Sequence, residues 1–183
     1  QLIFSEFLSG SNLDDNETTE RIVGGQNGLG AKITAVFSTE FTVETYDAET
    51  SIYYIQTFHN GLDIKDLPVI KSVNGKTPYT KITFLPDYKE FGINITNFYN
   101  TLYKIIESRA WQAAAYTNIK ITFNDQSIKI NSFQDFCQMF IPSMIYSTEM
   151  NNPVRKYPWS LCIGISDGKE RQISIVNGVF IGS

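Results

Sequence analysis

The chain has 183 residues, of which 42% are hydrophobic and 14% aromatic, enough apolar side chains for about one to one and a half average domains. Its net charge is −4 with a pI near 5.0, and Lys and Arg are scattered, which argues against this segment as the main surface for duplex DNA. No apolar run approaches the roughly 18 residues of a membrane span, so a soluble, intracellular protein is expected.

The first predicted elements flank a glycine-rich loop. Residues 1–8 have the mixed pattern of a helix end, and the polar stretch 9–15 interrupts it. A glycine-rich run over residues 24–30 is followed by apolar positions three and four apart over residues 31–37. This pattern predicts a short helix entered directly from a glycine loop.

Four runs rich in β-branched and aromatic residues come next, and they predict an antiparallel meander. These runs are residues 40–46, 51–58, 69–73 and 79–85. A long amphipathic helix is predicted after them, over residues 95–115, with Asn94 or Thr96 as its cap.

The last third of the chain again mixes strands and helices. A strand is predicted over residues 117–123 and a helix near 132–140. Three prolines and weak periodicity between Pro142 and Pro158 predict a domain boundary near residue 141. Two runs, 159–166 and 172–177, then predict a hairpin that starts a second sheet.

The strongest chemical signal is the loop GGQNGLGAK over residues 24–32. Its glycines allow tight turns that aim several N–H groups at one point, the following helix adds a partial positive charge, and Lys32 adds a mobile cation. These features favour a phosphate site, with an ordinary glycine-rich turn as the alternative. The loop is not a Walker A loop, because Ala31 follows Gly30 where Lys is needed, and it is not a GxGxxG loop, because Ile33 replaces the last glycine.

Other candidates for chemistry are weaker. His59 is the single histidine of the chain, which argues against a His cluster for metal or triad chemistry. Cys137 and Cys162 lie outside any CxxC spacing, so two buried free thiols are a better interpretation than a disulfide or a zinc site. No catalytic residue and no metal ligand is predicted in the chain.

The loop and its surroundings resemble the ATPase region of eukaryotic and viral type IIA DNA topoisomerases. GGQNGLGAK is similar to the GGRNGYGAK loop of that family, and the family's spacing continues through the following helix and strand. The segments LSGSNLDD, YTKITFLPDYKEF and QISIVNGV resemble further parts of the family, so the likeness spans essentially the whole chain. The abundance of Ile, Asn and Tyr suggests a large DNA virus as the source.

The resemblance implies an ATP site. The segment 10–12 would approach the ribose and α-phosphate, residues 25–32 would wrap the triphosphate, and Thr80 would help hold the adenine edge, often through water. Thr80 has an ordinary strand position as its alternative, and Ser11 and Asn12 have turn or capping roles as theirs. The implied nucleotide-binding residues are Gly10, Ser11, Asn12, Gly25, Gln26, Asn27, Gly28, Leu29, Gly30, Ala31, Lys32 and Thr80.

Two loop residues depart from the family's pattern. Gln26 replaces its lid arginine and Leu29 its tyrosine, so weaker lid closure is expected. By the resemblance, the catalytic glutamate and the magnesium-holding asparagine lie before Gln1, and the glutamine and lysine that touch the γ-phosphate lie after Ser183. We therefore expect a segment of a longer protein that is inactive alone.

The predicted fold class is α+β: a GHKL (Bergerat-type) ATPase sandwich with a mixed, largely antiparallel sheet over residues 1–141, then the start of an α/β transducer domain over 142–183. The resemblance implies part of the ATP gate of a type II DNA topoisomerase, an isomerase that passes one DNA duplex through another, with ATP and Mg²⁺ as cofactors. Its partners would be double-stranded DNA, bound through other domains, and a second copy of the chain. The location would be the host cytoplasm for a viral enzyme and the nucleus for a cellular one.

Two other functions fit the same scaffold. One is a GHKL-class dimerisation module that binds nucleotide without turnover, and the other is a chaperone or mismatch-repair ATPase.

Overall fold

The structure is a computed structural model that describes most of the chain in two compact units. The first unit contains the described residues up to Asn97, and the second contains those from Phe98 onward. The described residues are 2–6, 9, 25, 27–75, 77–117, 119–130, 132–141, 143–151, 158–166, 168, 172–176 and 179–182.

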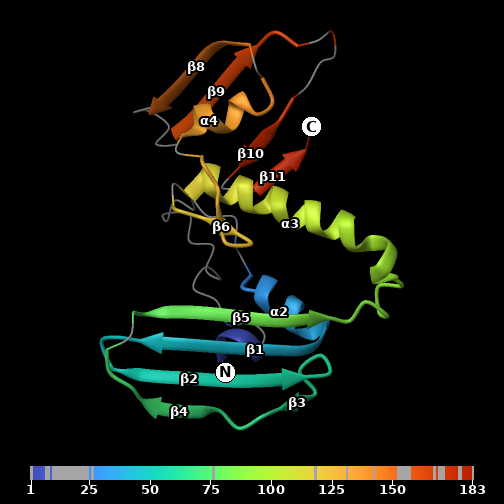
Figure 1. Ribbon diagram of the computed structural model, residues 1–183, viewed down its shortest axis with the longest axis vertical. Coiled ribbons are helices and arrows are strands. Elements are labelled where there is room, and N and C mark those ends of the chain that lie inside the picture. Colours follow the sequence, from blue (N-terminus) through green and yellow to red (C-terminus); the bar gives the residue numbers. More distant parts are fainter. Residues whose placement is uncertain are drawn as a thin grey trace. The chain divides into compact units, whose positions relative to one another are not determined.

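The first unit is an antiparallel sheet with two short helices (Figure 1). Its central strand β1 pairs with β2 on one side and with β5 on the other, and both β3 and β4 pair with β2. The elements are α1 (Leu2–Ser5), α2 (Gly30–Val36), β1 (Ser38–Asp47), β2 (Ile52–His59), β3 (Ile64–Lys65), β4 (Val69–Ser72) and β5 (Tyr79–Pro86).

The predicted antiparallel sheet is confirmed, but the predicted meander order is wrong. A meander would pair β5 with β4, whereas β5 returns to pair with β1. β4 is four residues long and exposed throughout, while β1 is ten residues long with buried positions along it. Pairing with the longer and more buried strand removes more backbone and apolar surface from water, which accounts for the order.

The core of the first unit lies between the sheet and the helices. Phe41 and Val43 alternate on one face of β1, and Phe58 of β2 is opposite Phe41. Ala35 of α2 is buried with them, and the Phe4 ring of α1 lies 6.1 Å from the Phe41 ring between centroids. Phe41 and Phe58 are each only 1% exposed, and burial of such a side chain contributes about 1.5–3 kcal/mol. This face is therefore the one that the helices cover.

The turn after β2 packs against the junction of α2 and β1. The Gly61 N–H donates to the Ser38 carbonyl oxygen at 3.0 Å. Gly61 has a φ of 68°, and a Cβ at this position would lie 2.6 Å from the Val36 carbonyl oxygen. Backbone conformation and lack of space therefore both require glycine here.

The opposite face of β1 carries polar and aromatic side chains. Tyr46 is buried, and its hydroxyl donates to the Val73 carbonyl oxygen at 2.9 Å. The Tyr79 hydroxyl donates to the Glu44 carboxylate. This hydrogen bond is the main cause that raises the pKa of Tyr79 to about 12, because a carboxylate acceptor favours the protonated phenol.

A long helix, α3 (Ile95–Thr117), leads into the second unit. The side-chain oxygen of Asn94 accepts from the Thr96 N–H at 3.0 Å, so Asn94 is the cap of α3. The helix α4 is capped in the same way by Ser132, whose hydroxyl accepts from the Asp135 N–H at 3.1 Å. The elements after α3 are β6 (Thr122–Phe123), β7 (Gln126–Ser127), α4 (Phe133–Gln138), β8 (Met144–Asn151), β9 (Pro158–Gly164), β10 (Ser174–Val176) and β11 (Val179–Gly182).

Two strand predictions in this part of the chain are wrong. The strand predicted over 117–123 is reduced to β6, because α3 continues to Thr117. The predicted hairpin of 159–166 with 172–177 does not form, since β9 pairs with β8 and β10 pairs with β11. β8 lies in the stretch between Pro142 and Pro158, where the prolines and weak periodicity predict a domain boundary and no strand. Hydrogen bonds to β9 stabilise this strand, although its sequence pattern does not indicate one.

The second unit has its own core, and that core continues across residue 141. Its buried side chains are Ala114 of α3, Phe136 of α4, and Ile128 and Ile130 from the segment between these helices. Ile175 of β10 packs against this group. The division of the chain into a GHKL domain over 1–141 and a transducer segment over 142–183 stays a prediction.

Candidate functional site

The backbone dihedral angle φ changes sign where the glycine loop enters α2. Gly28 has a φ of 62°, and Leu29, the N-cap residue, has φ −90° and ψ −24°. Alternation of this kind turns successive backbone N–H groups toward one side and makes a concave site for an anion. Leu29 makes no side-chain cap hydrogen bond to α2, whose first residue is Gly30. The first N–H groups of α2 therefore receive no side-chain cap from Leu29.

Lys32 is the most unusual side chain near this loop. It lies in the first turn of α2 and is only 1% exposed. Its ammonium donates to the Ser9 carbonyl oxygen at 2.8 Å and to the Gly28 carbonyl oxygen at 2.9 Å. Among the described residues no carboxylate forms an ion pair with it. Two carbonyl dipoles thus hold a buried positive charge that has three N–H donors.

The structure brings together only part of the predicted site. The described loop residues Gly25, Asn27 and Ala31 are exposed, and residues 30–32 form the start of α2. The carbonyl of Ser9 meets the loop through Lys32, a contact that sequence reasoning missed because a backbone carbonyl leaves no side-chain signal. Four predicted residues lie outside the described part of the chain: Gly10, Ser11, Asn12 and Gln26.

Thr80 lies on β5 opposite Thr45 of β1. Their hydroxyl oxygens are 3.1 Å apart and hydrogen-bonded, and the Thr45 hydroxyl also donates to the Tyr79 carbonyl oxygen at 3.0 Å. Because Thr45 follows Phe41 and Val43 at alternate positions of β1, this pair lies on the sheet face that the helices cover. Thr80 is exposed there, and its hydroxyl retains further hydrogen-bonding capacity.

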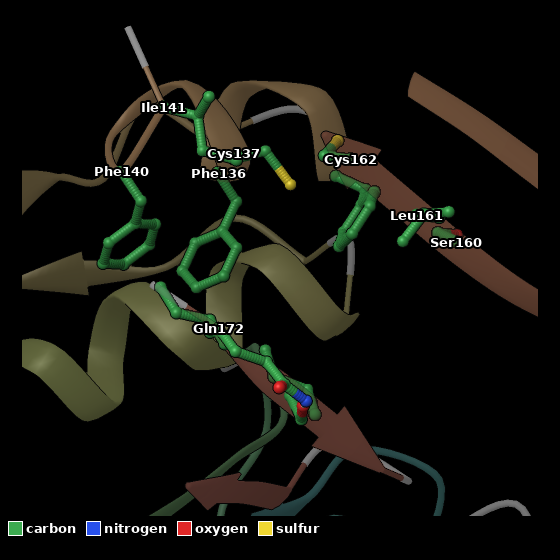
Figure 2. Close-up of a pocket in the computed structure, with 12 residues that line it drawn as sticks. Phe136, Cys137, Phe140, Ile141, Ser160, Leu161, Cys162 and Gln172 are labelled. Atoms are coloured by element: carbon green, nitrogen blue, oxygen red, sulfur yellow. The ribbon is translucent and has the colours of Figure 1, made fainter. Parts of the chain in front are cut away.

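A separate cavity of about 530 Å³ lies in the second unit, between α4, β9 and residues 172–175 (Figure 2). Its wall combines aromatic side chains from α4 and its end with polar groups from β9 and residues 172–174. Cys137 and Cys162 both line it, and both are free thiols. Burial, followed by a hydrogen bond to the Cys162 thiol, raises the pKa of Cys137 to about 12. The predicted free thiols are therefore found beside each other.

The described part of the chain has neither a cluster for a metal ion nor a helix for a membrane. No three His, Cys, Asp or Glu side chains there are grouped so that they could hold a metal ion. No helix there has both the length and the apolar character needed to cross a membrane.

Comparison with known proteins gives a consistent set of relatives, although no protein-family profile matches the chain. DNA topoisomerase 2 of Arabidopsis thaliana is 33% identical over 187 residues, covering 98% of this chain and 12% of that protein. DNA topoisomerase 2 of Acanthamoeba polyphaga mimivirus is 40% identical over 141 residues, covering 77% of this chain and 11% of that protein.

Solved structures agree with these relatives. The ATPase region of Saccharomyces cerevisiae topoisomerase II matches with a TM-score of 0.79 and 31% identity, over 98% of this chain and 46% of that chain. The ATPase and transducer domains of DNA topoisomerase II from Balamuthia mandrillaris match with a TM-score of 0.79 and 27% identity, over 98% of this chain and 45% of that chain.

The helix-covered antiparallel sheet and these structural matches define the fold as an α+β fold of the GHKL ATPase type. The chain spans only 12% of the length of a full relative. Within that span it is homologous to the ATPase region of DNA topoisomerase II, and the resemblance noted from the loop is confirmed.

Proposed function

We propose that the complete protein is an ATP-dependent type II DNA topoisomerase and that this chain supplies part of its nucleotide-binding gate. The observation that carries the proposal is the buried Lys32 ammonium beside the positive-φ Gly28, within a segment homologous to the topoisomerase II ATPase region. Relatives named DNA topoisomerase 2 align along nearly the whole chain, which does not favour a dimerisation module without turnover.

Electrostatics support phosphate as the ligand of this loop. Among the described residues, carbonyl dipoles alone hold this buried cation, and two partial charges do not equal one full negative charge. A phosphate oxygen supplies the missing charge and accepts the remaining N–H of Lys32. The N–H groups turned by Gly28 and Leu29 offer additional donors to the same anion.

The remaining nucleotide contacts are proposed from the homologous segment. Thr80 would face the adenine edge from the helix-covered side of the sheet, where its hydroxyl already meets that of Thr45. The triphosphate would lie along residues 25–32, and residues 10–12 would approach the ribose and α-phosphate.

The partners of the complete protein follow from the same proposal. They are double-stranded DNA, bound through other domains, and a second copy of the gate. Magnesium would accompany ATP, as the homology to an ATPase region implies.

The test is the affinity of a non-hydrolysable ATP analogue for the protein and for three variants. Gly28→Ala forces an L side chain into a φ of 62°, at a cost of roughly 1–2 kcal/mol, and should weaken binding about tenfold. Gly30→Ala meets no atom within 4 Å, so it should leave stability unchanged and weaken binding only through closer contact with the ligand. Unchanged analogue affinity in both variants would refute the phosphate loop.

Lys32→Met keeps most of the buried stem and removes the charge. We expect a loss of roughly 10–100-fold in affinity for the ATP analogue, since a charge-assisted hydrogen bond contributes about 1.5–3 kcal/mol. Adenosine affinity should change little. The matched control is Lys71→Met, which removes an exposed charge on β4 and should affect neither ligand. Equal losses for both ligands would give Lys32 a role in folding instead of phosphate binding.

A further inference from the structure

The cavity in the second unit places two thiols on neighbouring elements. Cys137 comes from α4 and Cys162 from β9, and Figure 2 shows the two side chains next to each other at one side of the cavity. The Cys137 thiol is hydrogen-bonded to the Cys162 thiol. Two neighbouring thiols on adjacent elements are the starting arrangement from which a disulfide forms.

The two thiols differ in their access to solvent. Cys137 is buried, whereas Cys162 is half-buried. The side chains around Cys137 are mainly apolar, among them Phe136, Phe140 and Ile141. A small oxidant therefore reaches the Cys162 sulfur first. None of the residues of the proposed nucleotide site belongs to this unit, so the thiol pair is a separate site.

We propose that Cys137 and Cys162 form a redox-sensitive pair, which a peroxide oxidises to a disulfide that joins α4 to β9. In the first step the Cys162 thiolate attacks one oxygen of hydrogen peroxide, and the O–O bond breaks. The leaving hydroxide takes up a proton as water, and Cys162 becomes a sulfenic acid. In the second step the Cys137 sulfur attacks the Cys162 sulfur, and its proton leaves with the departing hydroxide as a second water.

The environment of each thiol determines its role in this sequence. Because the pKa of Cys137 is raised to about 12, this residue is a protonated thiol at neutral pH and a poor first nucleophile. It acts as the resolving thiol, since the sulfur of Cys162 is already within hydrogen-bonding contact. Resolution within the chain competes with further peroxide attack, so the disulfide is expected in place of sulfinic or sulfonic acid. Burial also predicts that oxidation is slower than for a pair of exposed thiols.

The disulfide would change the second unit in a measurable way. It closes a loop that contains β8 and holds α4 against β9 at the cavity. A crosslink of this kind restricts the unfolded chain and limits separation of the two elements. Amide hydrogen exchange in α4 and β9 should therefore slow after oxidation and return to its original rate after reduction with dithiothreitol.

Peptide mass spectrometry of the protein tests the proposal directly. The protein is treated with hydrogen peroxide, remaining thiols are blocked with N-ethylmaleimide, and the chain is digested with trypsin without reduction. The sequence predicts one peptide for each cysteine, residues 130–155 for Cys137 and 157–169 for Cys162. We expect these two peptides joined, with the loss of two hydrogen atoms, and separated again by dithiothreitol. A mixture of isotope-labelled and unlabelled protein should give no mixed pairs, because the link is within one chain.

Single variants assign the order of the two steps. In Cys137→Ser, Cys162 has no resolving partner and should accumulate as sulfenic acid, which dimedone traps. In Cys162→Ser, Cys137 should stay reduced under the same treatment. The wild-type measurement needs no variant, so loss of folding in a variant leaves the test valid. Unlinked peptides carrying sulfinic or sulfonic acid, mixed isotope pairs, or equal oxidation of Cys137 in Cys162→Ser would each overturn the proposal.

Discussion

A single methyl group at Gly61 should destabilise the first unit strongly. Two costs act together at this turn. Alanine in a φ of 68° costs roughly 1–2 kcal/mol, and displacing the Val36 carbonyl oxygen, 2.6 Å from the new Cβ, adds an overpacking cost of roughly 1–3 kcal/mol. The free energy of unfolding should therefore fall by about 2–5 kcal/mol in Gly61→Ala.

Gly92→Ala separates the two costs. Gly92 lies in the same unit with a φ of 61°, but a Cβ there meets no atom within 4 Å, so only the conformational cost of roughly 1–2 kcal/mol applies. Both tryptophans, Trp111 and Trp159, lie in the second unit, so amide hydrogen exchange of β1 and β2 during urea unfolding is the suitable measurement. Equal destabilisation by the two alanines would show that the turn does not pack against α2 as described.

Two further predictions concern the two faces of the sheet. Phe41→Ala should lower the free energy of unfolding by about 3–5 kcal/mol in the same exchange measurement. Phe84→Ala, at a position 48% exposed on the neighbouring strand, should lower it clearly less. Similar losses in the two variants would contradict the assignment of the core to β1. Tyr79 stabilises the fold through its neutral phenol, so its contribution is complete below pH 10 and is lost as the pH rises through about 12. Glu44→Gln should move the Tyr79 titration down toward 10, measured as the tyrosinate absorbance lost in Tyr79→Phe, and an unmoved titration would exclude Glu44 as the cause.

The sequence pattern predicts elements better than it predicts their partners. The β-branched and aromatic residues of the run 40–46 predict a strand where β1 is found, and apolar spacing predicts α2 and α3 close to their observed bounds. Pairing depends on competition between strands that lie far apart in the chain, which local spacing does not record. For this reason the return of β5 to β1 and the partner of β9 could not be predicted from the runs themselves.

The candidate site also has a part that the sequence predicts and a part that it does not. The glycine spacing predicts a loop that enters a helix, and Gly28 takes the positive φ that such a loop needs. The environment of Lys32 could not be predicted, because its two partners among the described residues are backbone carbonyls, one of them 23 residues away in sequence. A cationic residue near glycines indicates a mobile side chain on the surface, whereas packing makes this one buried.

The burial of Lys32 makes its amine a built-in reporter of loop opening. Among the described residues it is the only buried lysine, so a water-soluble acylating reagent should modify the other described lysines first. Acylation of Lys32 requires the ammonium to leave the carbonyls of Ser9 and Gly28 and to lose a proton in water. Its labelling rate, relative to that of an exposed lysine in the same sample, therefore measures how often this segment opens. A single covalent mark thus records motion of the loop without any nucleotide present.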